Sequence, residues 1–179
     1  MMRKNKQDWL ETGMMILGQA GINGLTIERM TMEMGVTKGS FYHHFKNAQV
    51  FEEQLIAYWA NQYLSTSAET PGSSVELLAL LDTIMEGTFG SITEPEVAIR
   101  FWAYRDENVR SHVEGVDAVR LGFVRKVFRS MVRDETQAQM MADMLFAMMI
   151  GSIMALPRIP SGRVLDMYKE FKRLYRLDG

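Results

Sequence analysis

The sequence predicts an all-α protein with an N-terminal three-helix domain followed by a larger helical domain, about nine helices in total. Three observations lead to this prediction. Apolar residues recur at helical spacing in most segments. Only four of the 179 residues are prolines, and no segment is a candidate strand.

The first predicted helix is outlined by apolar residues from Leu10 to Leu17, and the chain breaks at Gly21. The spacing of Gly18, Gly21 and Gly24 is also that of a phosphate-binding loop. No strand precedes these glycines, however, so a helix end followed by a turn is the favoured interpretation.

The segment from Thr26 to Phe45 predicts two short helices joined by a tight turn. Thr26 and Thr37 are suitable N-caps, because a threonine hydroxyl can accept a hydrogen bond from a free amide at a helix start. Gly35 supplies the left-handed residue that ends the first helix. Phe41 and Phe45 lie four residues apart and can be buried together. This is the pattern of a helix-turn-helix, whose second helix enters the DNA major groove.

The rest of the chain predicts longer helices. Asn47 is the expected N-cap of a helix over residues 48–63, and Thr70 to Ser74 form the clearest linker. The further predicted helices cover residues 77–85, loosened after that by Gly87 to Gly90, and then residues 95–104, 108–131, 136–156 and about 161–177.

Three short motifs carry a resemblance to a known family: Gly24-Leu25-Thr26-Ile27, Gly35-Val36-Thr37-Lys38-Gly39 and Phe41-Tyr42-His43-His44-Phe45. Over about residues 9–59 the chain resembles the TetR-type (tetracycline-repressor-like) transcriptional regulators. It departs from them at Ala48, where a phosphate-binding lysine is common, and at Thr31 and Met34, where small alanines are common. The resemblance implies a DNA-binding domain over residues 1–47 and a ligand-binding and dimerisation domain over residues 48–179.

The predicted DNA contacts come from the helix-turn-helix. Tyr42 and His44 are expected to hold phosphates, as the matching positions do in the family, while Lys38, Gly39 and His43 are candidates for base edges. Lys46 can substitute for the lysine missing at Ala48. The full set is Thr26, Thr37, Lys38, Gly39, Ser40, Tyr42, His43, His44 and Lys46.

The resemblance also implies a ligand cavity among the middle helices, lined by aromatic and soft side chains. The candidates are Trp59, Tyr63, Phe89, Phe101, Trp102, Arg120, Phe123 and Met148. Each of them alone could be ordinary core. Arg120 can pair with Asp117 one turn earlier, or it can anchor an anionic group of a ligand; both interpretations stay open.

Dimerisation is predicted through the helix over residues 136–156, which is apolar nearly all round, together with the final helix. Gly151, Ser152 and Ala155 are small enough to permit close approach. The apolar residues of the final helix are Val164, Met167, Tyr168, Phe171 and Leu174. The many methionines are typical of core or of a deformable pocket, and they favour copper sensing far less.

Composition narrows the functional classes. The net charge of −2 divides unevenly, with six basic and four acidic residues over residues 1–50, and 14 basic and 18 acidic residues beyond. There is no cysteine, which excludes disulfides and thiolate metal sites. The adjacent His43 and His44 point apart on a helix, so neither a metal nor another cofactor is expected.

Glu11 interrupts any signal-peptide pattern, and the apolar run over residues 144–157 is too short to span a membrane, so a cytoplasmic location is expected.

The predicted function is therefore a ligand-responsive transcriptional regulator, most simply a repressor. It would bind near-palindromic double-stranded operator DNA as a homodimer and be released by a small hydrophobic or amphipathic effector. The alternative is a helical DNA-binding protein with no small-molecule ligand, regulated through a protein partner. An enzyme is disfavoured, because the sequence contains no catalytic constellation.

Overall fold

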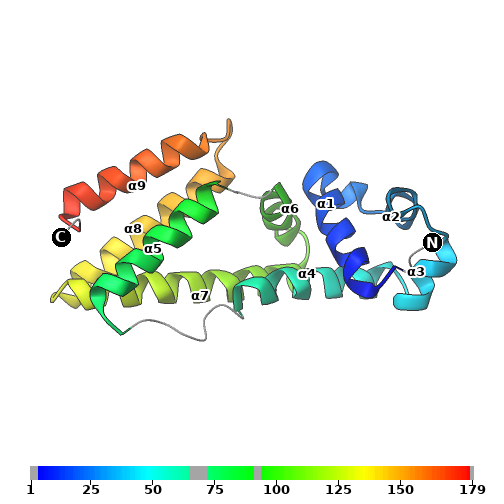
Figure 1. Ribbon diagram of the computed structural model, residues 1–179, viewed down its shortest axis with the longest axis horizontal. Coiled ribbons are helices and arrows are strands. Elements are labelled where there is room, and N and C mark those ends of the chain that lie inside the picture. The colour runs from blue at the N-terminus through cyan, green and yellow to red at the C-terminus, as the bar shows by residue number, and fades with distance from the viewer. Residues whose placement is uncertain (1–3, 65–71, 91–93, 178–179) are drawn as a thin grey trace. The chain divides into compact units, whose positions relative to one another are not determined.

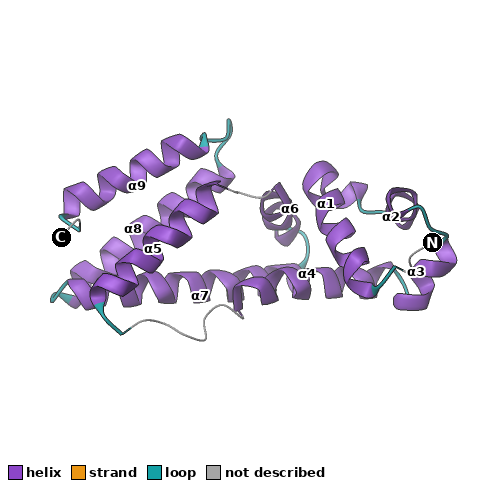
Figure 2. Cartoon of the chain, in the orientation of Figure 1, coloured by secondary structure: helices purple, strands orange, loops and turns teal. Residues whose placement is uncertain are grey.

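The computed structural model describes residues 4–64, 72–90 and 94–177, and over these residues it contains nine helices and no strand (Figures 1 and 2). The all-α prediction is confirmed. The helices are α1 (Lys6–Gly24), α2 (Ile27–Met34), α3 (Lys38–His44), α4 (Ala48–Leu64), α5 (Ser74–Gly90), α6 (Glu94–Ala103), α7 (Glu107–Met131), α8 (Glu135–Met154) and α9 (Ser161–Tyr175).

The helices pack into two compact units. The first unit comprises Met1–Thr66 and Thr93–Val116, and the second comprises Ser67–Ile92 and Asp117–Gly179. The division falls within α7 and assigns α4 and α6 to the same unit as α1–α3. It does not coincide with the expected boundary after residue 47, which is a functional division and stays a prediction.

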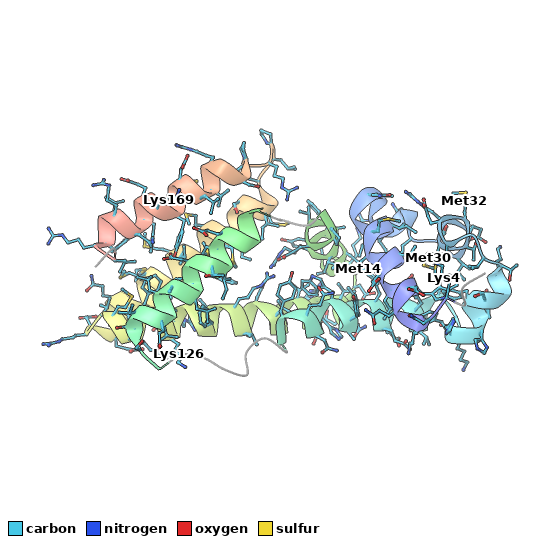
Figure 3. The ribbon with its side chains drawn as sticks, in the orientation of Figure 1. Lys4, Met14, Met30, Met32, Lys126 and Lys169 are labelled. Carbon is cyan, nitrogen blue, oxygen red and sulfur yellow. The ribbon has the colours of Figure 1, made fainter. Side chains whose placement is uncertain are left out.

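The first unit is built around aromatic side chains. Trp9 of α1 is fully buried and meets Phe41 edge-on, with ring centroids 5.4 Å apart. Phe51 of α4 packs against Phe45 at 4.9 Å. Met30 of α2 is buried in the same core (Figure 3). These contacts hold α1, α2, α3 and α4 around one interior.

Helix α6 packs closely on α1, as Figure 1 shows. A methyl group added at Gly18 would lie 2.7 Å from Cδ of Pro95, so only glycine fits at this crossing. The helix kinks at Gly21, which has φ 64°, and then continues to Gly24. The prediction that the glycines here are a helix end and a turn is thus partly correct. The chain bends at Gly21, whereas Gly18 allows Pro95 of α6 to pack closely against α1.

The second unit joins α5, the later part of α7, α8 and α9 around a second core. Leu81, Phe128 and Leu145 are among its most buried side chains. A polar contact also ties α5 to α9, because the hydroxyl of Tyr168 donates to Asp82 at 2.7 Å. The predicted loosening of α5 at Gly87 was wrong, since the helix continues through to Gly90. Of the predicted linker, Thr70 and Pro71 lie outside the described residues.

The apolar surface of α8 and α9 is mostly used inside the second unit. Val164, Tyr168 and Phe171 of α9 are buried there, and so is Ser152 of α8, whose hydroxyl donates to the carbonyl of Met149 at 2.7 Å. Those four residues are therefore not available to a second copy, contrary to the prediction. What α8 leaves exposed is a narrower stripe at helical spacing: Met140, Met144, Ala147 and Gly151. We call these four residues the α8 stripe.

No helix among the described residues is long and apolar enough to cross a membrane.

Candidate nucleic-acid interface

The turn between α2 and α3 is closed by backbone hydrogen bonds around a left-handed glycine. Gly35 has φ 64° and ψ 37°, a conformation that costs little without a side chain. Its amide donates to the carbonyl of Met32 at 3.2 Å, and the amide of Val36 donates to the carbonyl of Thr31 at 3.0 Å. Helix α3 begins two residues later, as the sequence predicted.

The buried aromatic contacts of helix α3 lie on one face. Phe41 and Phe45 are both buried, with their rings 5.3 Å apart, and Phe41 also contacts Trp9 and Phe51. Because these contacts come from one side, the opposite side of a seven-residue helix stays accessible. The predicted DNA-contact residues lie there or beside it: Lys38, Gly39, Tyr42, His43 and Lys46 are exposed, while Ser40 and His44 are half-buried.

The two predicted N-caps differ. Thr26 accepts a hydrogen bond from the amide of Arg29 at 3.2 Å and caps α2 as expected. Thr37 occupies the N-cap position of α3, but its hydroxyl makes no capping bond. The sequence thus predicted the N-cap position of Thr37 correctly, but the capping hydrogen bond expected from its hydroxyl is not formed. The exposed hydroxyl of Thr37 is consequently available to a ligand such as a phosphate.

Lys38 forms an ion pair with Glu28 of α2. The hydrogen bond between them lowers the pKa of the Glu28 carboxyl and raises the pKa of the Lys38 ammonium. Sequence reasoning missed Glu28, because the two residues lie ten positions apart on different helices. Spacing along one helix therefore gives no sign of their contact.

His44 is engaged at the other end of α3. Its Nε2 lies 3.1 Å from the backbone carbonyl of Lys4 and donates to it, since a carbonyl can only accept. Lys6 lies nearby, with its Nζ 5.7 Å from the centre of the Phe45 ring. Figure 3 labels Lys4 in this region. Neither lysine was among the predicted DNA contacts. Lys4, just before α1, and Lys6, the first residue of α1, bring positive charge next to the end of α3.

The sequence comparisons agree with this geometry. Residues 10–52 match the family "bacterial regulatory proteins, tetR family", a segment that contains the whole helix-turn-helix. This segment is a tetR-family DNA-binding domain, as the resemblance predicted, and the chain is a DNA-binding transcriptional regulator. No curated protein matches it in sequence.

Solved structures share the fold of this chain over nearly all of its length. Escherichia coli NemR in its reduced form is 18% identical, with a TM-score of 0.63, and the alignment covers 92% of this chain and 96% of NemR. A transcriptional regulator of the TerR/AcrR family from Aquifex aeolicus VF5 is 16% identical, with a TM-score of 0.65 and coverage of 97% and 99%. At these identities the likeness concerns the fold alone.

The predicted ligand residues divide between the two units. Trp59, Tyr63, Phe101 and Trp102 belong to the first unit, where Trp59 and Tyr63 pack with rings 5.5 Å apart. Trp59 and Trp102 are buried, whereas Phe101 is half exposed. The indole nitrogen of Trp59 is buried without a hydrogen-bond partner. Trp59 is thus a core residue that still carries an unused donor.

The remaining ligand candidates belong to the second unit. Arg120 is mostly buried, and its Nη1 lies 3.9 Å from the Asp117 carboxylate, which is the ion pair that the sequence allowed. Phe123 and Met148 are half-buried against the second core. The side chain of Phe89 lies outside the described residues.

A pocket of about 550 Å³ opens on the second unit between α8 and α9. Its lining residues are Asp134, Thr136, Gln137, Met140, Met141 and Tyr175. None of the predicted ligand residues is among them. The described residues contain no group of three or more histidine, aspartate or glutamate side chains that could hold a metal ion.

Proposed function

We propose that this TetR-family chain is a repressor that binds a near-palindromic operator as a homodimer in the cytoplasm and is released by a small hydrophobic or amphipathic molecule. The observation that carries the DNA-binding part is the accessible side of α3. One face of the helix is buried through Phe41 and Phe45, and the other presents donors to the outside.

The donors on α3 divide into two roles. Tyr42 projects its ring to solvent with 56% exposure while its edge packs on Phe41, so its hydroxyl is held on a semi-rigid support that suits a phosphate. Thr37 offers an uncommitted hydroxyl at the helix start, and Lys46 offers an ammonium just after its end. Lys38, Gly39 and His43 occupy the accessible side between them and are assigned to base edges.

Selection of bound duplexes from a random pool tests this proposal. The expected result is a near-palindromic consensus, because a two-fold symmetric dimer presents two identical recognition helices about 34–36 Å apart, or at a longer separation. Retention of all duplexes alike, at moderate salt, would rule out an operator-binding function.

The homodimer is supported by the α8 stripe. Met140 and Met144 are exposed in one protomer although they are large and apolar, and Ala147 and Gly151 continue the same line with small side chains. A methyl group added at Gly151 would meet nothing within 4 Å, so the packing of one protomer does not require glycine there. A second helix could approach this line closely, as small residues at a helix interface permit.

Substitution within the α8 stripe tests the dimer. We expect Ala147→Glu to yield monomers at micromolar concentration by light scattering, since two carboxylates would face each other across the two-fold axis. Val75→Glu provides the matched control, because Val75 is an apolar residue of α5 that is 77% exposed and lies off the stripe. A wild-type monomer, or dimers that survive Ala147→Glu, would refute this interface.

Release by a small molecule rests on the ligand-lining residues that the family resemblance implies. Because the chain lacks cysteine, a thiol-based response is not open to it, and a non-covalent effector is proposed instead. Linkage requires operator DNA to weaken effector binding by the same factor that the effector weakens DNA binding. Fluorescence titration of hydrophobic and amphipathic probes, with and without operator, measures that factor. Equal affinities in both states would exclude the mechanism.

A further inference from the structure

The ion pair between Glu28 and Lys38 is not explained by the needs of the fold. Both side chains are largely exposed, 65% for Glu28 and 59% for Lys38. Exposed ion pairs add little to folding stability, because solvent screens the charges and two flexible side chains must be ordered. The packing of α2 and α3 is already provided by buried residues such as Met30 and Phe41.

A carboxylate in this position also works against general DNA binding. It repels phosphates, and by pairing with Lys38 it reduces the charge that the start of α3 can offer the DNA backbone. The first turn of α2 is a favourable place for an acid, because of the helix dipole. That effect accounts for an acidic residue at position 28, but it gives no reason for the side chain to reach the recognition helix.

The chemistry of the pair matches one base pair in the major groove. Guanine presents the acceptors O6 and N7 there, and its partner cytosine presents the N4 amino donor. An ammonium can donate to guanine, and a carboxylate can accept from cytosine. O6 and N4 are themselves joined by a base-pair hydrogen bond of about 2.9 Å. The ammonium and carboxylate of Lys38 and Glu28 are likewise within hydrogen-bond distance of each other.

We propose that Glu28 and Lys38 act as one unit that reads a G·C base pair, with Lys38 donating to guanine and Glu28 accepting from the N4 amino group of the paired cytosine. The inference rests on the proposed DNA-binding function and adds a specificity-determining residue outside the recognition helix. A·T also places a donor, adenine N6, beside an acceptor, thymine O4. It fits less well, because thymine has a methyl group beside that acceptor where guanine offers N7 as a second acceptor to the ammonium.

The experiment compares the duplexes selected by the wild type, Glu28→Ala, Lys38→Ala and Glu33→Ala. Glu33 is an exposed glutamate of the same helix and serves as the matched control for loss of one negative charge. Melting temperatures confirm folding, which an exposed pair should hardly affect.

We expect the wild type to select G·C at one position of each half-site. Both Glu28→Ala and Lys38→Ala should reduce discrimination at that same position, by about five- to 150-fold in relative affinity, and leave other positions unchanged. Glu33→Ala should leave the consensus unchanged.

Two outcomes would overturn the inference while the regulator function stands. In the first, Glu28→Ala tightens binding to every duplex by one factor with an unchanged consensus, so that Glu28 only restrains Lys38. In the second, the two variants change different positions, so that they do not form one unit. A wild type that selects no sequence would overturn the proposed function itself, and the inference with it.

Discussion

Gly39→Ala should stabilise the protein and weaken its DNA binding at the same time. Gly39 is the second residue of α3, and a methyl group added there would meet only the Thr37 hydroxyl, at an ordinary contact distance of 3.6 Å. The fold therefore has no steric need for glycine at this position. Glycine in a helix is nevertheless less favourable than alanine.

The size of the stability gain expected for Gly39→Ala follows from these facts. Glycine-to-alanine changes at compatible positions stabilise proteins by about 0.4–1 kcal/mol, mostly by restricting the unfolded chain. For a chain of this size each kcal/mol raises Tm by about 2–4 °C, so the expected increase is about 1–4 °C. If the floor of the major groove lies against Gly39, an added methyl group forces the helix away. Overpacking of about 1–3 kcal/mol corresponds to a loss of affinity of about five- to 150-fold.

Thermal melting and fluorescence anisotropy with the selected operator measure the two effects. Gly122→Ala is the control, because Gly122 is an exposed glycine of α7 with open space around it and lies outside the helix-turn-helix. It should raise Tm similarly and leave the operator affinity unchanged. If Gly39→Ala raises Tm with no loss of affinity, DNA does not approach α3 at this residue. If it lowers Tm, the space that the structure shows around Gly39 is not there.

Three further predictions concern single side chains. Tyr42→Phe removes a phosphate donor and should weaken binding to all duplexes by about the same factor, which competition between cognate and random DNA would reveal. Arg100→Met should cost about 3–5 kcal/mol in urea unfolding, because it removes the cation of a buried ion pair, whose Nη2 lies 2.9 Å from the Glu96 carboxylate; removing both charges together should restore most of the loss. Burial, followed by the nearby Asp106, raises the pKa of Glu52. A raised carboxyl pKa means that stability falls as the pH rises through it, so Glu52→Gln should raise Tm at pH 7 and have no such effect below the ordinary glutamate pKa.

Local pattern was sufficient to predict the helix-turn-helix. Thr26 caps α2, Gly35 takes the left-handed conformation, and the rings of Phe41 and Phe45 lie against each other, because each of these contacts joins residues within four positions. Asn47 likewise caps α4 by accepting from the amide of Val50 at 2.8 Å. Short-range geometry is dictated by the chain itself, so a single sequence is enough to infer it.

Contacts between helices were not predictable in the same way. The partner of Lys38 lies ten residues back on another helix, and the partner of His44 lies 40 residues back, before the first helix begins. Both contacts depend on how helices cross, which periodicity does not specify. For His44 the consequence is functional. Its Nε2 is already bonded to Lys4, so a phosphate contact would have to use Nδ1 or displace that bond.

The glycines of α1 show how one pattern can have different causes. Gly18, Gly21 and Gly24 are evenly spaced, yet Gly21 bends the helix while Gly18 leaves room for Pro95, which lies 77 residues further along the chain. The residues near Gly18 in the sequence therefore give no sign of its contact with Pro95. The contact also makes α6 part of the unit whose core holds Trp9 beneath Phe41. The unit that contains α3 thus includes a helix of the predicted ligand-binding domain, so the predicted boundary after residue 47 does not coincide with a division in the packing.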